Sequence, residues 1–382
     1  MSLKWENYFL RKGVSCVDFW DSYIKEGKRD ILFLLAIGFD PRTSAGLETI
    51  YTFDSKIGKR DVIGIRYYTT ERKDDPSDSA VMNHVSLIES FLEERGLPMP
   101  TYKDLVMRSA SDISSASANA AADIISGLEE IEPYTDIVVD ISAMPRSVFI
   151  ALVNKLLILV EHHNAKNIGV INLHLLTTEN SHLDSKIIEQ GIEETPSYIQ
   201  GFALIEKART SDFRKVWIPI LGENQRDQFV KIRDQIQPDE ICPILPFPSM
   251  DLRRGDELIN YYQDVLLSDP AFSLANIIYA DELNPFHTYR LLVDAITRYK
   301  TSFDLLRGCK IYLSTLSSKL LSIGTFLAAY EIKSKGLEVG ILHVESRGHK
   351  LKDEITREGI KEIAEKNNLF EIWLAGEAYN KN

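Results

Sequence analysis

The sequence predicts an α/β protein of two tandem Rossmann-like lobes with mostly parallel sheets, related by internal duplication. Three observations favour this fold class. Strand-like apolar runs alternate with helix-like stretches along the chain. Segments of the first half recur in the same order in the second half. The 382 residues also exceed what one compact core usually serves.

The first recurring segment is an apolar run that ends in a Gly-x-x-x-Arg pattern. It ends on Gly38 and Arg42 in the first half, and on Gly222 and Arg226 in the second half. Each copy is interpreted as a buried strand that stops at a Gly turn, with an arginine just beyond its carboxyl end.

The second recurring segment is a strand, then hydroxyl residues, then a basic residue that opens a helix. In the first half these are Ser142 and Arg146. In the second half they are Thr315, Ser317, Ser318 and Lys319. Two shorter matches follow, one aligning His174 with His343 and the other aligning Gly191 with Gly359. Four matches in the same order indicate duplication.

The elements of the first lobe are short apolar strands and longer stretches with helical spacing. Near-continuous apolar strands such as the one containing Val138 and Val139 are typical of sheets covered on both faces. In chain order the sequence predicts strand 31–38, strand 61–69, helix 79–95, strand 103–108, helix 112–130, strand 136–142, helix 147–162 and strand 167–176.

The second lobe repeats this alternation by the same criteria. In chain order the sequence predicts strand 215–221, helix 224–236, strand 239–246, helix 253–267, strand 274–280, helix 285–302, strand 310–315, helix 318–335 and strand 337–345. Two further apolar stretches, 197–204 and 369–375, are interpreted as equivalent late strands of the two copies.

We therefore expect three divisions of the chain: a helical extension over 1–29, the first lobe over 30–212 and the second lobe over 213–382. No low-complexity linker separates the lobes, so we expect them to pack together.

Composition limits the classes of function. The 44 basic and 56 acidic residues give a net charge of −12, which argues against binding long nucleic acid or an anionic membrane over the whole surface. The longest apolar run, 31–39, is far short of a membrane-spanning helix. No signal-peptide pattern opens the sequence, and three scattered cysteines form no disulfide framework. We expect a cytoplasmic protein.

The duplicated basic residues are the leading site candidates. Ligands of open α/β sheets bind beyond the carboxyl ends of the strands, where Arg42, Arg146, Arg226 and Lys319 are predicted to lie. A helix amino terminus with hydroxyls and a cation is a phosphate site. The alternative is that the hydroxyls are helix caps and the cations are solvated. A cation at the positive end of a helix is unfavourable, so its recurrence favours an anionic ligand.

Secondary candidates follow later strands of the second lobe. Arg253 and Arg254 open a predicted helix and either reach the same crevice or form a solvated charge run. The cluster from Tyr279 to His287 contains Asp281, Glu282 and His287, which suit base or ribose recognition or acid–base catalysis. In the alternative, Asp281 is a turn residue and Asn284 an N-cap before Pro285.

Metal and cofactor signals are lacking in the sequence. His174 and His343 lie in apolar strands, which favours core histidines over ligands. No His, Cys or carboxylate set has zinc spacing, and GxxxxGK[ST], GxGxxG and GxSxG do not occur. We predict no metal and no cofactor, and disfavour a P-loop kinase, a dinucleotide dehydrogenase and an α/β-hydrolase.

The segment from Asp140 through Ser142 to Arg146 resembles the strand-four motif of CARF domains, in which Asp-x-Thr/Ser precedes a basic residue and a helix. The second copy is similar but has Leu313 in place of the aspartate. Gly38 and Gly222 match the first ligand-binding loop of that class. SAVED domains resemble two such copies fused in one chain. The resemblance implies Rossmann-like folds that bind cyclic oligonucleotides across two copies.

CARF and SAVED proteins usually carry an attached nuclease or protease, and the sequence shows none. The resemblance therefore implies a sensor subunit of a prokaryotic defence system with a separate effector protein. The function we expect is binding or sensing of a nucleotide-type phosphorylated ligand, such as a cyclic oligonucleotide, in a crevice between the lobes. The alternatives are a nucleotide-dependent transferase or hydrolase, glycosyltransferase-like, that uses Asp281, Glu282 and His287, and a structural scaffold.

Overall fold

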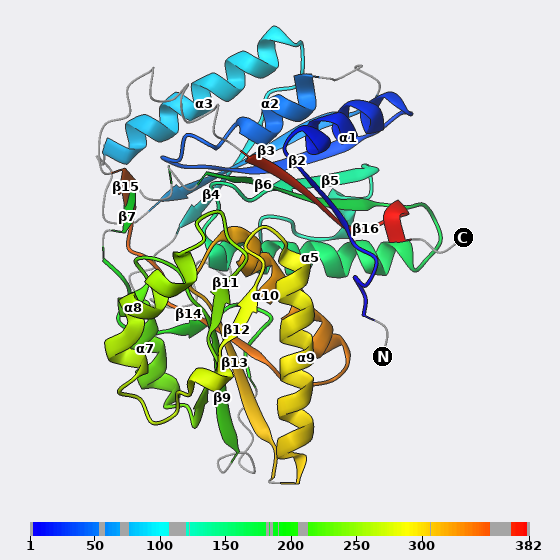
Figure 1. Ribbon diagram of the computed structural model, residues 1–382. Helices are drawn as coiled ribbons and strands as arrows, with labels where there is room; N and C mark the ends of the chain where they lie inside the picture. The colour runs from blue at the N-terminus through cyan, green and yellow to red at the C-terminus, as the bar shows by residue number, and fades with distance from the viewer. Residues whose placement is uncertain are drawn as a thin grey trace. The chain divides into compact units, whose positions relative to one another are not determined.

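The computed structural model divides the chain into two compact units (Figure 1). Lobe A comprises Asn7–Gly191 and Arg347–Asn382, and lobe B comprises Met1–Glu6 and Ile192–Ser346. The structure describes residues 3–52, 58–68, 76–106, 120–121, 123–180, 183, 186–189, 191–204, 213–305, 307–351 and 368–379.

Lobe A contains a seven-stranded sheet of order β1-β16-β6-β5-β2-β3-β4. The five strands from β6 to β4 are parallel, whereas β16 pairs antiparallel with both β6 and β1. The strands are β1 (Phe9–Lys12), β2 (Ile31–Ile37), β3 (Arg60–Tyr68), β4 (Thr101–Val106), β5 (Asp136–Asp140), β6 (Asn172–Glu179) and β16 (Asn368–Ala375).

Helices cover both faces of this sheet. One face packs against α1 (Val14–Lys25), α2 (Ala45–Thr52) and α3 (Pro76–Glu94), whose apolar side chains join those of β2 in one core cluster. The fourth helix, α5 (Arg146–Asn164), packs against β6 and β16. The predicted helix 112–130 falls largely outside the described residues, which show the short 3-10 helix η1 (Leu128–Glu130).

Lobe B has a second sheet, of order β12-β11-β9-β13-β14-β8, with β10 paired to β9. Every pairing is parallel except β14 with β8. The strands are β8 (Ser197–Tyr198), β9 (Arg214–Ile220), β10 (Glu240–Ile241), β11 (Ile244–Pro246), β12 (Ile278–Ala280), β13 (Cys309–Thr315) and β14 (Gly340–His343). The single strand predicted over 239–246 is interrupted at Pro243, which lacks an N–H for the ladder.

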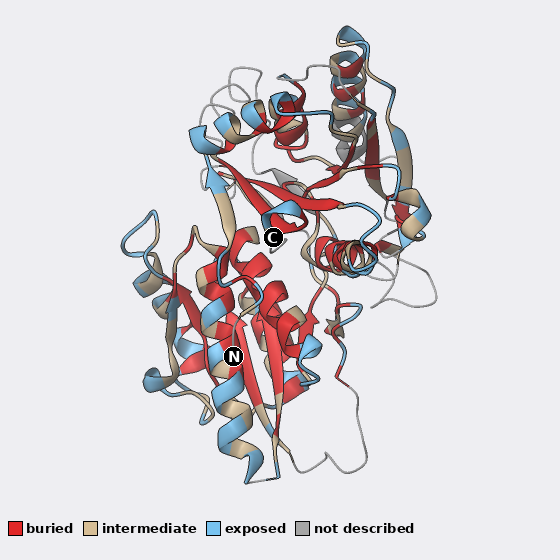
Figure 2. Cartoon of the chain, turned by 90° about the vertical axis from the view of Figure 1, so that its right-hand side faces the viewer, coloured by how far each residue is buried: buried red, intermediate tan, exposed pale blue. Residues whose placement is uncertain are grey.

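Four helices connect these strands: α7 (Arg226–Ile236), α8 (Arg254–Leu266), α9 (Pro285–Asp304) and α10 (Lys319–Ser334). The core cluster on one face combines side chains of α7 and α8 with Trp217, Tyr312 and Leu342. Helices α9 and α10 pack together and against β13. In Figure 2 the central strands of both sheets are coloured as buried over most of their length, which explains the near-continuous apolar sequences of strands such as β2, β5 and β9.

The predicted fold class is confirmed: two α/β lobes with mostly parallel sheets. The five parallel positions have the same order in both lobes, since β6-β5-β2-β3-β4 corresponds to β14-β13-β9-β11-β12 in chain order. This identity is what internal duplication predicts. In each lobe the chain adds the second and third parallel strands on one side of the first strand, and the fourth and fifth on the other side. This reversal places the topological switch point between β2 and β5 in lobe A and between β9 and β13 in lobe B.

The two late strands are exchanged between the lobes. β16 from the end of the second copy pairs with β6 of lobe A, and β8 from the end of the first copy pairs with β14 of lobe B. The structure therefore changes lobe at Gly191/Ile192 and returns at Ser346/Arg347, whereas the sequence placed one boundary at 212/213. The expected 1–29 extension contributes β1 and α1 to lobe A, while residues 1–6 belong to lobe B.

Short antiparallel pairings accompany these changes of lobe. Strand β7 (Ile187–Glu189) pairs with β15 (His349–Leu351), and Ile192 bridges Ser346. Within the part of the chain that the structure describes, no helix combines the length and apolarity needed to cross a membrane.

Candidate functional site at the carboxyl edges of the sheets

The carboxyl edge of lobe A holds a buried arginine. Arg42 follows β2, and its guanidinium donates to Asp40 through Nε at 3.0 Å and Nη2 at 2.8 Å. Its Nη1 donates to the carbonyl of Thr178 near the end of β6, 3.3 Å away. Both charged side chains are buried. Arg42 and Asp40 therefore form a buried salt bridge.

Ser142 connects two neighbouring strand ends of lobe A. Its backbone N–H donates to Asp140 Oδ1 at 2.9 Å, and its Oγ accepts the Thr178 N–H at 2.8 Å. The Thr178 peptide is thus held by both predicted residues, Arg42 through its carbonyl and Ser142 through its N–H. Thr178 was not predicted; the only signal was a Thr-Thr pair ending an apolar strand.

Arg146 is the first residue of α5. Pro145 is the N-cap residue and supplies no side-chain cap. Gly38, after β2, has open space around it, because a Cβ placed there meets no atom within 4 Å. The four predicted residues of lobe A therefore share one edge of one sheet, with Arg42 and Ser142 joined through Thr178.

In lobe B, Lys319 is likewise the first residue of its helix, α10. Ser318 caps α10, since its Oγ accepts the Leu321 N–H at 3.4 Å. Gly222 is closely packed: a Cβ there would lie 2.4 Å from the Leu316 carbonyl oxygen and 2.7 Å from Ser317 Cα. The structure thus brings the loops after β9 and β13 together at the switch point.

Arg226 opens α7 and forms an ion pair with Asp264 of α8. This hydrogen bond raises the pKa of Arg226 above its usual value. The pair is largely exposed, in contrast to Arg42 and Asp40 in lobe A. Glu223, close to Arg226 in the sequence, binds Arg254.

Arg254, the first residue of α8, contacts two carboxylates. Its Nε and Nη2 donate to Glu223 at 2.6 and 2.7 Å, and its Nη1 donates to Glu282. Burial by itself would raise the pKa of Glu223, but the hydrogen bonds and charge of Arg254 outweigh it and lower that pKa. Glu282 also accepts the Met250 N–H at 2.8 Å. Both carboxylates of this cluster, Glu223 and Glu282, are therefore paired with Arg254.

The other two candidate catalytic residues make local contacts. Asp281 Oδ1 accepts the Leu283 N–H at 2.9 Å, and His287 Nδ1 accepts the Asp281 N–H at 3.0 Å. Asn284 caps α9 by accepting from Phe286 N, as expected of an N-cap before Pro285. These are turn and capping roles, and the catalytic role of the cluster stays a prediction. Tyr279 is 50% exposed.

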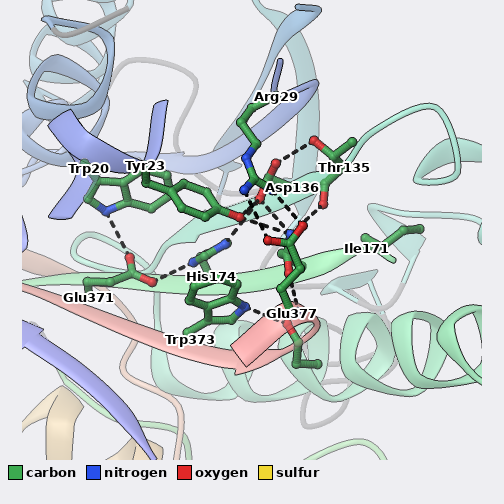
Figure 3. Close-up of polar contacts among 12 residues, drawn as sticks. Trp20, Tyr23, Arg29, Thr135, Asp136, Ile171, His174, Glu371, Trp373 and Glu377 are labelled. Carbon is green, nitrogen blue, oxygen red and sulfur yellow. Dashed lines mark hydrogen bonds and ion pairs between the residues drawn. The ribbon is translucent and has the colours of Figure 1, made fainter. Parts of the chain in front are cut away.

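His174 is confirmed as a core histidine (Figure 3). Its Nδ1 lies 2.7 Å from Glu371 Oε1 on β16, and its Nε2 lies 3.4 Å from Asp136 Oδ1 on β5. Two side chains of α1 also bind this cluster: Trp20 donates a hydrogen bond to Glu371, and Tyr23 donates one to Asp136. The side chains of Asp136, His174 and Glu371 are all fully buried. Asp136 and His174 lie in the amino-terminal halves of β5 and β6, away from the carboxyl edge of the sheet described above.

The buried charges shift one another's pKa values. Burial lowers the pKa of His174, but Glu371 and Asp136 overcome this and raise it to about 9. Burial raises the pKa of Glu371 above its usual range despite His174. Burial has the same tendency at Asp136, but the contacts with His174, Thr135 and Tyr23 lower its pKa. His174 is therefore a cation between two carboxyl groups at neutral pH.

The strand registers revise two sequence matches. Leu34 pairs with Val139 in lobe A and Ile218 pairs with Leu313 in lobe B, so with Gly38 aligned to Gly222 the counterpart of Asp140 is Ser314 and not Leu313. His174, however, pairs with Val138, whereas His343 is the last residue of β14. The two histidines occupy different levels of their sheets, so their match is not a structural equivalence. The fourth match lies outside the described residues at Gly359.

The four cations are divided equally between the lobes, Arg42 and Arg146 in lobe A and Arg226 and Lys319 in lobe B. Their convergence on one crevice stays a prediction. Over the described ranges, no group of three or more His, Cys, Asp or Glu side chains is arranged to hold a metal ion.

No protein-family model matches the chain, and a search of curated proteins finds no relative. Two solved structures show weak similarity. One is a Streptococcus pneumoniae protein assigned as a tRNA (m1A22) methyltransferase, bound to S-adenosyl-L-methionine; it is 11% identical, with 58% of this chain and 86% of that chain covered and a TM-score of 0.19. The other, assigned as a UDP-N-acetylglucosamine 2-epimerase from Listeria monocytogenes, is 10% identical, with 82% and 78% covered and a TM-score of 0.22. Such low scores carry no argument about function.

Proposed function

We propose that this protein binds a nucleotide-type phosphorylated ligand at the carboxyl edges of its parallel sheets. One recurring arrangement carries the proposal. In both lobes the helix after the fourth parallel strand begins with a basic residue, Arg146 in α5 and Lys319 in α10. The N-cap residues before them have nearly equal φ and ψ, −58° and 149° at Pro145, and −58° and 165° at Ser318.

The physical basis is the electrostatics of a helix start. Neither first turn contains an acidic residue, so neither helix supplies its own counter-charge there. A cation at the positive end of a helix dipole is unfavourable by about 0.3–1 kcal/mol. A phosphate reverses this penalty and accepts charge-assisted hydrogen bonds from the cation and from backbone N–H groups of the first turn.

The finer proposal is that the ligand is a cyclic oligonucleotide and that the protein is a sensor acting with a separate effector. It is supported by the resemblance of the segment Asp140 to Arg146 to the CARF motif, and by the SAVED-like duplication of the chain. The shared strand order of the two lobes supports the duplication on which this proposal depends.

The test is calorimetry with mono-, di- and cyclic oligonucleotides on the wild type and on Arg146→Ala and Lys319→Ala. We expect each alanine variant to weaken binding by about tenfold or more with little loss of stability. Arg146→Lys should recover part of the affinity, because lysine lacks the planar fork. The matched control is Lys166→Ala, an exposed cation just beyond the far end of α5. Wild-type failure to bind every ligand, or equal binding by the alanine variants, would overturn the proposal.

A further inference from the structure

Two buried polar atoms lie at the carboxyl edge of lobe B. Thr315 is 0% exposed and His343 is 7% exposed. Neither Thr315 Oγ1 nor His343 Nδ1 has a hydrogen-bond partner among the residues that the structure describes. Leaving such a group unsatisfied costs about 1–3 kcal/mol, so two at one place need an explanation.

The two side chains are neighbours on one face of the sheet. Strands β13 and β14 are parallel, with Leu313 opposite Ile341. Two residues further along each strand, the same register places Thr315 opposite His343. Alternate residues of a strand point to the same face, and adjacent strands are about 4.8 Å apart. A guest oxygen atom between the two side chains is therefore within reach of both.

This face is the one that α10 covers. The opposite face carries Tyr312 and Leu342, which pack with α7 and α8, so Thr315 and His343 point away from those helices. The 16-residue helix α10 starts at Lys319, directly after the end of β13. The amino end of α10 therefore lies at the carboxyl edge of the sheet, where β13 ends.

The other ring nitrogen of His343, Nε2, faces the carboxylate of Glu345. His343 Nε2 lies 3.6 Å from Glu345 Oε2. A carboxylate on one ring nitrogen orients the imidazole and leaves the other nitrogen for a ligand. Glu345 therefore supports Nδ1 as the ligand-facing atom.

We infer that Thr315, His343 and the amino end of α10 form a phosphate subsite in lobe B for the ligand proposed above, on which this inference rests. Thr315 Oγ1 and the Nδ1–H of His343 donate to phosphate oxygens, and Lys319 supplies positive charge. In a place shielded from water these charge-assisted bonds are stronger than at the surface. The sequence named Thr315 and Lys319 but placed His343 in the core.

The experiment compares Thr315→Val and His343→Phe with the wild type, using inorganic phosphate and ADP as probes in calorimetry and urea unfolding for the ligand-free proteins. We expect each variant to bind both probes about tenfold or more weakly. The ligand-free variants should be at least as stable as the wild type, because each replacement removes an unsatisfied polar atom. Thr288→Val is the matched control, since Thr288 Oγ1 is equally buried and unpartnered among the described residues but belongs to α9.

The outcomes separate this inference from the proposed function. If Lys319→Ala weakens binding while Thr315→Val and His343→Phe bind like the wild type, the proposed function stands and the subsite is wrong. A loss of ligand-free stability without a loss of affinity indicates an ordered structural water and also overturns the subsite. If the wild type binds neither phosphate nor any nucleotide, both proposals fail. Should His343→Phe not fold, Thr315→Val alone decides.

Discussion

Lobe A and lobe B share a strand order but use charge differently. The arginine after the first strand is buried against Asp40 in lobe A, whereas its counterpart Arg226 forms an exposed pair with Asp264 in lobe B. The two lobes also differ at one equivalent pair of positions on the fourth and fifth parallel strands. In lobe A this pair is Val138 and His174, and in lobe B it is Tyr312 and Gly340. Side chains of Tyr198 and Leu204 pack closely over Gly340.

The difference teaches that topology and ionic content diverge separately after a duplication. Lobe A contains an internal ionic cluster that holds β16 to β5 and β6. Lobe B closes the same place with apolar and small side chains. A buried ionic cluster is thus part of the core of lobe A at a place that lobe B fills with Gly340, Tyr198 and Leu204.

The largest expected effect comes from breaking the ionic core of lobe A. His174→Leu leaves Glu371 and Asp136 buried without their shared cation, which should cost about 3–5 kcal/mol of unfolding free energy. Urea denaturation measures this loss. The double variant His174→Leu/Glu371→Leu should recover part of it, because one of the stranded charges is removed. A single variant as stable as the wild type would show that the cluster contributes nothing.

The arginines after the first strands should differ next. Arg42→Ala removes the guanidinium that pairs with the buried Asp40 carboxylate. The expected loss of unfolding free energy is about 3 kcal/mol or more. Arg226→Ala breaks an exposed, solvent-screened pair and should barely change the melting temperature. Thermal unfolding of the two variants side by side checks the contrast, and equal shifts would contradict it.

Alkaline pH should destabilise lobe A through His174. The folded pKa of about 9 exceeds the ordinary value of about 6.5, so the stabilisation is complete below pH 6.5 and is lost as pH rises through 9. The expected loss is on the order of 3 kcal/mol. Unfolding free energies measured from pH 6 to 10 test this, with His174→Gln as the control that should lack the slope. A flat wild-type profile would refute the assignment.

The smallest contrast concerns the glycines after the first strands. Gly222→Ala introduces a Cβ 2.4 Å from a backbone oxygen and should cost about 1–3 kcal/mol. Gly38→Ala meets open space and should be neutral or stabilising by a few tenths of a kcal/mol. Denaturant midpoints of both variants decide. If Gly38→Ala is the more damaging, the two loops have been assigned the wrong packing.

Strong local signals explain what the sequence could predict. Continuous apolar runs located β2, β5, β9 and β13, and the capping positions before Arg146 and Lys319 located two helix starts within one residue. The eight-residue helix α2 was missed because it is too short for a clear periodicity. Its apolar residues Leu47, Ile50 and Tyr51 do share one helical face.

Long-range contacts explain what the sequence could not predict. Nothing local in 369–375 or 197–204 says which sheet each strand joins, so the exchange was not foreseen. The partners of Arg42 and Glu223 are likewise set by tertiary packing. His343 is buried as predicted, but its apolar strand does not reveal that it is the last residue of β14.

The exchange of β16 bears on how the chain is made. β16 lies inside the sheet of lobe A, between β1 and β6, yet it leaves the ribosome after all of lobe B. Lobe B has its last strand, β14, some twenty-five residues earlier, so it can fold while lobe A still lacks an inner strand. A nascent chain therefore exposes an open strand edge on β6 until β16 has been synthesised, and that edge is where a chaperone, or an unwanted neighbouring chain, would pair.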